Sequence, residues 1–260
     1  QPVQTPMQSH RQESNGVGRS MKVLDLFSGI GGFSLGLERA GMETVAFCEF
    51  DEHAQKVLRK HWPDVPIHSD IRELDAKQYR GTVDVVCGGF PCQDLSTAGK
   101  QVGFSGERSS LYGEMLRVIS ECMPRYAIFE NVTGLLTGDS GRWFGQFLYD
   151  LDQIGFDAEW HCIRACTAGL PQKRDRVWLI AYPNSQRLQG RLIGEQVRWG
   201  RQKLRAETLV DYGNGKATPK PKFCRDIDGV PNKSHRLKQL GNAVVPQIPE
   251  AIGRAIMGAT

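Results

Sequence analysis

The stretch Met21–Gly32, MKVLDLFSGIGG, decides the fold of this chain. Its first seven residues are mostly apolar and predict a short buried strand. Glycines follow, and apolar residues then recur from Phe33 to Ala40 before Gly41, which predicts a tight turn and a helix. A strand, a glycine loop and a helix in this order are typical of the turn with which open α/β sheets bind ligands.

The same alternation of apolar strands and amphipathic helices continues along the chain. Further strands are expected at 44–48, 83–87, 126–129, 161–164 and 176–181, and further helices at 52–61, 111–122, 143–154 and 246–257. Strands that alternate with helices favour a parallel-type sheet with right-handed crossovers. We therefore predict the α/β class, with a Rossmann-like sheet that carries helices on both faces.

Composition limits the kind of protein this can be. Of the 260 residues, 40% are apolar and 24% are charged, and no apolar run approaches the roughly 20 residues that span a bilayer. The first twenty residues lack the apolar core of a secretory signal and are rich in Gln, Ser, Gly and Arg. We expect a disordered extension over 1–20 and a cytoplasmic protein that does not contact a membrane.

The cysteines indicate reduced thiols rather than a metal site. Seven of them occur at scattered spacings without a C-x-x-C pair, so a zinc ribbon is not expected. His161, Cys162 and Cys166 are explained better as a strand and its exit than as metal ligands. We predict free thiols and no bound metal.

One segment is strongly basic. Residues 186–205 contain six arginines and lysines against a single glutamate, with Trp199 among them. A solvated loop is one interpretation, because charge runs usually face water. The other is a surface that contacts nucleic-acid phosphates through Arg198, Arg201 and Arg205, and the net charge of +4 leans towards such a polyanionic partner.

One cysteine lies where chemistry is expected. The predicted strand 83–87 is followed by Gly88-Gly89 and then by Pro91-Cys92-Gln93. This places Cys92 on a turn just past the carboxyl end of a strand, where open α/β sheets bind their ligands. A turn of this kind can expose and activate a thiolate. The pattern predicts covalent catalysis beside a bound cofactor.

Acids near the glycine loop indicate which cofactor is bound. A tight strand-to-helix turn would also explain the loop, but Glu49 ends the next predicted strand about twenty residues later, where an acid commonly meets ribose hydroxyls. Asp70, followed by Ile71, is placed to accept a hydrogen bond from an adenine amino group. Because nothing marks a lysine that binds pyrophosphate, we favour S-adenosylmethionine over NAD.

Five motifs occur along the chain in a specific order. They are Asp25-Leu26-Phe27-Ser28-Gly29-Ile30-Gly31-Gly32, Gly89-Phe90-Pro91-Cys92-Gln93, Glu130-Asn131-Val132, Gln172-Lys173-Arg174-Asp175-Arg176 and Gly241-Asn242-Ala243-Val244-Val245-Pro246. In this order they resemble the motifs of the DNA (cytosine-5)-methyltransferases, over 21–181 and 237–257. The resemblance implies a methyltransferase sheet that uses S-adenosylmethionine, with 21–181 as the catalytic and cofactor-binding domain and 236–260 as a segment that returns to it.

The resemblance implies four catalytic residues. Cys92 would add to carbon 6 of cytosine and so make carbon 5 nucleophilic. Glu130 would bond ring nitrogen 3 and the exocyclic amine, which requires a proton and therefore a raised pKa. Arg176 is similar to the residue that binds the cytosine carbonyl oxygen, and Arg174 to its supporting partner. Without the family, ordinary ion pairing with nearby aspartates would explain both arginines.

The resemblance also implies a cofactor pocket and a DNA surface. The pocket would be formed by Phe27, Gly29, Gly31, Gly32, Glu49, Phe50, Asp70, Ile71, Pro91, Leu111, Asn242 and Ala243. The segment 96–104 is similar to a loop that closes over the target base, and contacts with double-stranded DNA are expected at Gln93, Ser96 and Lys100. A base inside a duplex cannot reach a buried thiol, so the target nucleotide must be flipped out.

Residues 182–235 lie where the family has its target recognition domain and show no sustained hydrophobic period. We expect a short, irregular recognition region in a bacterial or phage enzyme that reads a short sequence, acts as a monomer and works beside a cognate restriction endonuclease. A tRNA cytosine-5 methyltransferase of the same fold is one alternative, although its usual Cys-Phe-Thr signature is missing. A catalytically inactive DNA-binding regulator is another, and the intact set of Cys92, Glu130 and Arg176 argues against it.

Overall fold

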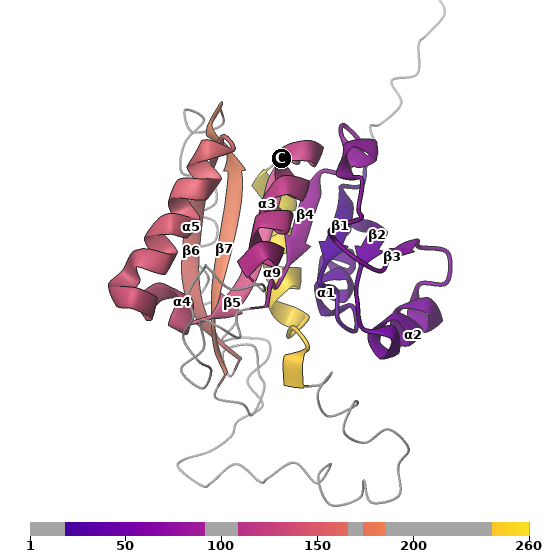
Figure 1. Ribbon diagram of the computed structural model, residues 1–260. Helices are drawn as coiled ribbons and strands as arrows, with labels where there is room; N and C mark the ends of the chain where they lie inside the picture. Colours follow the sequence, from indigo (N-terminus) through magenta and orange to yellow (C-terminus); the bar gives the residue numbers. More distant parts are fainter. Residues whose placement is uncertain (1–18, 92–108, 166–173, 186–240, 260) are drawn as a thin grey trace, which may run out of the picture.

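One seven-stranded sheet organises the part of the chain that the computed structural model describes, which is residues 19–91, 109–165, 174–185 and 241–259 (Figure 1). The strands are β1 (Lys22–Leu26), β2 (Glu43–Cys48), β3 (Ile67–His68), β4 (Val85–Gly88), β5 (Tyr126–Val132), β6 (Phe156–Arg164) and β7 (Asp175–Pro183). Their order across the sheet is β3-β2-β1-β4-β5-β7-β6.

Helices connect and cover these strands. They are α1 (Gly32–Arg39), α2 (Glu52–His61), α3 (Ser109–Cys122), α4 (Gly134–Thr137), α5 (Arg142–Gln153) and α9 (Gln247–Ala259), with the 3-10 turns η1 (Ala76–Tyr79) and η3 (Gly138–Gly141). At the end of α1, Gly41 has a φ of 96° and the amides of Gly41 and Met42 donate to Glu38 and Leu37. These are the two bonds of a Schellman cap, so Gly41 ends the helix as predicted.

The sheet is mixed, which corrects one expectation. β3, β2, β1, β4 and β5 run parallel, whereas β7 is antiparallel to both β5 and β6. β6 therefore runs in the same direction as the first five strands, and the prediction of a parallel-type sheet is wrong for β7 alone. A parallel crossover needs a dozen or more residues, and the segment 165–174 between β6 and β7 is too short for one.

Two apolar cores lie on opposite faces of the sheet, which confirms the predicted cover of helices on both faces. On one face, Met115 and Ile119 of α3 pack with Phe147 of α5 and the inward residues of the strands. On the other face, Leu37 of α1 packs with Ile252 of α9. The C-terminal helix thus lies against the first helix of the chain.

The order of the strands creates a switch point at the middle of the sheet. From β1 the chain moves outward to β2 and β3, and then crosses to β4 on the other side of β1 (Figure 1). Loops leaving the carboxyl ends of β1 and β4 diverge at such a point, which is where open α/β sheets bind ligands. The glycine loop 29–32 and Gly89–Pro91 are the loops that leave this edge.

Candidate functional site at the carboxyl edge of the sheet

Several predicted site residues lie outside the described residues. They are Cys92, Gln93, Ser96, Lys100, Arg198, Arg201 and Arg205. The structure therefore describes the loop to Cys92 only as far as Pro91, which is half-buried. The roles of these seven residues stay predictions.

Backbone hydrogen bonds hold the loops of this edge side by side. The amide of Ser28 donates to Cys48 O at 3.2 Å, and the amide of Glu49 donates to His68 O at 2.9 Å. On the other side of β4, the buried Asn131 donates from Nδ2 to Phe90 O at 3.4 Å. These contacts join the ends of β1, β2 and β3 to one another and, on the other side of the switch point, the end of β4 to that of β5.

Glu130 lies between two arginines on this surface. Its Oε1 is 3.0 Å from Nε of Arg176 and 3.6 Å from Nη2 of Arg174, and all three side chains are at least three-quarters buried. β5 continues past Glu130 to Val132, so Glu130 lies within the strand rather than at its end. The antiparallel β7 supplies Arg176, because its register places Arg176 opposite Val132. The alternative of simple pairing with adjacent aspartates does not describe this cluster.

Burial and charge act on Glu130 in opposite directions. Burial raises the pKa of the Glu130 carboxyl, and Arg176 and Arg174 oppose the rise without cancelling it. Gly89 lies next to the same carboxyl, since a Cβ at Gly89 would come within 3.2 Å of Oε2. The acid therefore faces the loop that leads to Cys92 and is biased towards its protonated form.

Arg174 also connects this cluster to the C-terminal segment. Its guanidinium donates to Gly241 O at 2.8 Å and to Asn242 O at 3.4 Å. Asn242, predicted to close the cofactor pocket, thus meets the arginine through its carbonyl, while its side chain is exposed. Ala243 beside it is half-buried.

Glu49 is held on the other side of the switch point by backbone groups. Its Oε2 accepts from the amide of Gly29 and its Oε1 from the amide of Asp51, both at 2.7 Å. Gln55 fixes the same residue by donating to Glu49 O at 2.6 Å. Burial raises the pKa of Glu49, and the two backbone hydrogen bonds counteract that rise.

Two aromatic residues belong to this edge of the sheet. Phe50 follows it directly and is 75% exposed, unusual for a ring of that size. Phe27 ends the β1 turn with a φ of 51°, in the left-handed region that aromatic residues rarely adopt. Both features occur at the edge where the sequence predicts a bound ligand.

Asp70 is already paired in this structure. Arg72 donates to both of its carboxylate oxygens, with distances of 2.6 to 3.1 Å, and this pairing lowers the pKa of Asp70. The Arg72 amide also donates to Oδ1 at 3.0 Å, so each carboxylate oxygen already accepts two contacts from Arg72, and a further donor would displace one of them. Ile71 is buried, and Leu111 of α3 packs at the edge of the same core.

The glycines of the loop have neighbours that their sequence spacing does not reveal. A Cβ at Gly31 would meet the ring of Trp62 at 2.6 Å, and one at Gly32 would meet Val244 O at 2.6 Å. A Cβ at Gly36 would meet Pro246 O at a still closer approach. Of the glycines at 29, 31, 32 and 36, only Gly29 would have no atom within 4 Å of an added Cβ. Close packing of protein on protein thus accounts for three of these glycines.

One buried residue was not singled out by the sequence. Asp25 is fully buried below the loop and accepts from Ser34 Oγ at 2.7 Å and from the Ser34 amide at 3.3 Å. Burial raises the pKa of Asp25 to about 7. A lone aspartate within an apolar strand is the only signal in the sequence that could have marked it.

The residues present fit an adenine nucleoside with a sulfonium side chain. Phe50 offers an exposed ring for stacking. The Glu49 carboxylate offers acceptor oxygens for hydroxyl donors, and a Cβ at Gly29 would meet nothing within 4 Å. Among the described residues no three His, Cys, Asp or Glu side chains gather to hold a metal ion, and no helix there is long and apolar enough to cross a membrane.

The fold defines the class of α/β methyltransferases, and solved structures share it. A DNA modification methyltransferase encoded within an Escherichia coli prophage is 29% identical, with a TM-score of 0.55 over 65% of this chain and 48% of that one. A DNMT2 from Spodoptera frugiperda, 24% identical with a TM-score of 0.51, supports the fold alone.

The particular family follows from the sequence of the chain. Residues 21–223 match the model of the C-5 cytosine-specific DNA methylases, and the chain belongs to that family. This confirms the resemblance that the five motifs indicate.

Curated relatives agree with this assignment. The Type II methyltransferase M.Eco47II of Escherichia coli is 42% identical over 164 residues, which are 62% of this chain and 39% of that protein. M.HhaI of Haemophilus parahaemolyticus is 32% identical over 169 residues, 65% of this chain and 51% of that protein. The chain therefore spans from about two fifths to about half of the length of these relatives.

Proposed function

We propose that this chain transfers the methyl group of S-adenosylmethionine to carbon 5 of cytosine in duplex DNA, at a short sequence. One observation carries the proposal. Glu130, buried between Arg174 and Arg176, faces the Gly89 loop that leads to Cys92. An acid, two fixed cations and a nearby thiol are the groups that a covalent reaction on a pyrimidine requires.

In this mechanism Glu130 acts as a proton donor. As Cys92 Sγ adds to carbon 6, an electron pair of the ring moves towards nitrogen 3, and the Glu130 carboxyl supplies the proton that stabilises it there. Carbon 5 becomes nucleophilic as a result. The raised pKa of Glu130 favours the protonated carboxyl that this step needs. After methylation, a water molecule would take the proton from carbon 5, the Cys92 thiolate would leave carbon 6, and nitrogen 3 would return its proton to the Glu130 carboxylate, which restores both the ring and the acid.

The two arginines have complementary tasks in the proposal. Arg176 would bind the cytosine carbonyl oxygen, and Arg174 would support it while its bonds to Gly241 O and Asn242 O fix its own position. Because both also face Glu130, the base would replace part of the contact that the acid makes in the free protein.

S-adenosylmethionine would supply an electrophilic methyl group when bound. Glu49 would accept bonds from the ribose hydroxyls, and Phe27 and Phe50 would flank the adenine ring. Asp70 and Ile71 would bind the edge of the adenine. Pro91, Leu111, Asn242 and Ala243 complete the proposed pocket.

The DNA side of the proposal depends on residues outside the described ranges. The target base would leave the duplex, and the unstacking cost of a few kcal/mol would be offset by contacts of Gln93, Ser96 and Lys100 and by phosphate contacts of the basic segment 186–205. The proposal includes a monomer in the cytoplasm that acts beside a cognate restriction endonuclease, with 182–235 as its recognition region.

A mechanism-based trap tests the nucleophile. We expect the chain to form a denaturant-resistant adduct with a duplex that contains 5-fluorocytosine when S-adenosylmethionine is present, and Cys92→Ser to lose the adduct and all methylation while still binding DNA. Cys162→Ser is the matched control, because Cys162 is a free, exposed cysteine on β6.

Three outcomes would contradict the proposal. Methylation by Cys92→Ser would exclude the assigned nucleophile. An adduct with fluorocytosine tRNA but not with duplex DNA would make the chain a tRNA enzyme. DNA binding by the unaltered chain without any adduct would make it an inactive regulator.

A further inference from the structure

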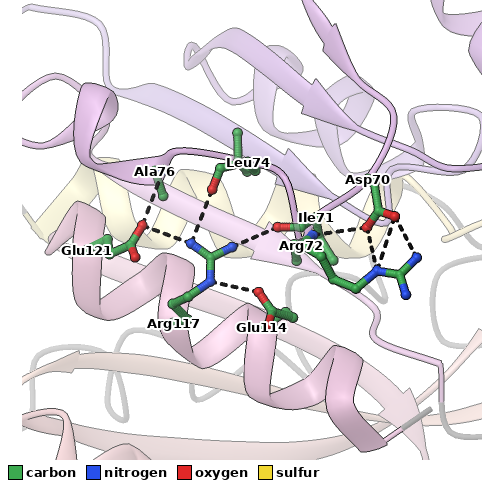
Figure 2. Close-up of polar contacts among 8 residues, drawn as sticks. All are labelled: Asp70, Ile71, Arg72, Leu74, Ala76, Glu114, Arg117 and Glu121. Atoms are coloured by element: carbon green, nitrogen blue, oxygen red, sulfur yellow. Dashed lines mark hydrogen bonds and ion pairs between the residues drawn. The ribbon is translucent and has the colours of Figure 1, made fainter. Parts of the chain in front are cut away.

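An arginine on α3 contacts the loop that carries the proposed adenine-binding residues. Arg117 donates from Nη2 to Ile71 O at 2.7 Å and from Nη1 to Leu74 O at 3.1 Å (Figure 2). Both carbonyl groups belong to buried residues more than forty positions earlier in the chain. A single guanidinium therefore joins the middle of α3 to the turn that follows β3.

Two glutamates of the same helix hold this guanidinium in place. Nε of Arg117 donates to Glu114 at 2.7 Å and Nη1 donates to Glu121 at 2.9 Å. Burial would lower the pKa of Arg117, but the hydrogen bonds and charges of these glutamates raise it. Three nitrogens of one rigid fork thus have fixed partners, which a lysine could not reproduce.

The same helix contacts the far end of the turn. Glu121 accepts from the Ala76 amide at 3.3 Å, and the thiol of Cys122 donates to Ala76 O at 3.3 Å. Within the turn, the amide of Leu74 donates to Ile71 O at 3.3 Å. The segment 71–76 is therefore fixed to α3 at both ends.

The start of this segment is the part that would contact the cofactor. Ile71 carries one of the two carbonyl groups that Arg117 binds, Asp70 directly precedes it, and Figure 2 shows the Asp70 carboxylate a short way along the same turn. α3 also carries Leu111, which is proposed to line the pocket. One helix would thus set the relative position of two parts of the pocket.

We propose that Arg117 is a positioning residue for the adenine edge: it fixes the turn so that Asp70 and Ile71 meet the adenine amino group and ring. The inference rests on the proposed function, because it assumes that this edge binds an adenine nucleoside. Arg117 touches no reacting atom and acts only through the carbonyl groups of Ile71 and Leu74.

Ligand binding without turnover tests this role. We expect Arg117→Met to weaken the binding of S-adenosylhomocysteine by about tenfold, as the loss of charge-assisted hydrogen bonds implies, and Arg117→Lys by about threefold, measured by calorimetric titration of the whole chain. For an analogue in which hydrogen replaces the adenine amino group, the loss should shrink to less than about twofold. Arg117→Lys gives the same test where Arg117→Met fails to fold.

A matched control separates positioning from general stability. Arg142→Met removes a helical arginine that pairs with Asp139 three residues earlier, on the exposed start of α5, and should leave both affinities unchanged. An equal loss of affinity for the two ligands in the Arg117 variants would overturn the inference but not the proposed function. If the unaltered chain bound neither ligand, both would fall.

Discussion

Two regions of the sheet hold partly buried glutamates in different ways. In the parallel half, Glu49 is held by the amides of Gly29 and Asp51. Where β5 pairs with the antiparallel β7, Glu130 is held by the guanidinium groups of Arg174 and Arg176. Burial raises the pKa of both acids, but only Glu130 has positive charges beside it.

In the proposed function, this difference would separate binding from chemistry. Backbone amides supply fixed dipoles that do not move when a neutral hydroxyl approaches, which suits an acid that accepts hydrogen bonds from a ligand. Arginine side chains can exchange one oxygen partner for another, which suits an acid that must change its protonation state beside a substrate. The comparison teaches that a raised pKa alone does not distinguish a catalytic acid from a binding one.

The largest expected effect tests this division directly. Glu130→Gln should lower the rate of a single turnover by about a hundredfold or more, because an amide cannot deliver the proton, while cofactor affinity stays within about twofold. Glu49→Gln should do the reverse and weaken the cofactor by about tenfold, because its amide nitrogen would face a backbone N–H. Single-turnover kinetics and cofactor titration measure the two quantities. If both variants changed the same quantity, whether the single-turnover rate or the cofactor affinity, the proposed division of roles would be wrong.

A second, smaller effect concerns stability in the parallel half. Gly36→Ala should lower the free energy of unfolding by about 2 kcal/mol, because the new methyl group overlaps Pro246 O of the segment before α9. Gly113→Ala in α3 is the control, since a Cβ there meets nothing within 4 Å and alanine is the better helix former. Urea unfolding of both variants checks this. Equal stabilities would mean that α1 and α9 adjust freely.

The most gradual effect is a pH dependence of stability from Asp25. The folded protein binds this proton more tightly than the unfolded chain, since burial raises the pKa from 3.8 to about 7. The contribution of this bound proton to the free energy of unfolding is full below pH 3.8. It is lost as the pH rises through about 7, at about 1 kcal/mol per pH unit. Asp25→Asn removes this dependence, so the difference in unfolding free energy between the two proteins should change between pH 5 and 8. If the difference in unfolding free energy stayed constant with pH, Asp25 would not be the group that takes up this proton.

Much of the parallel half could be predicted from the sequence because its signals are local. The helix Glu52–His61 has the predicted bounds, and the Asp51 side chain caps it. β6 was expected only from His161 but begins at Phe156, because its side chains are largely exposed at the edge of the sheet and show no apolar alternation. The direction of β7 depends on pairing, which no run of residue types records.

The residues of the candidate site likewise differ in how well the sequence predicts them. Glu49 and the glycine loop could be identified because strand and turn patterns place them at one edge. The contacts of Arg174 and Arg176 with Glu130, and of Arg117 with Ile71 O, join residues 44 to 46 positions apart and leave no periodic trace. The spacing of the glycines indicated a ligand, yet Gly32 and Gly36 also admit the backbone of the C-terminal segment.

The C-terminal segment that contains Val244 and Pro246 affects when the site can form during translation. Every strand of the sheet precedes residue 184, but Val244 and Pro246 lie against the loop that begins the domain. A ribosome that has translated all seven strands has therefore not yet produced the atoms that line this loop. We expect a nascent chain to gain its finished nucleoside site only when α9 emerges from the exit tunnel, so that binding competence appears later than the sheet itself.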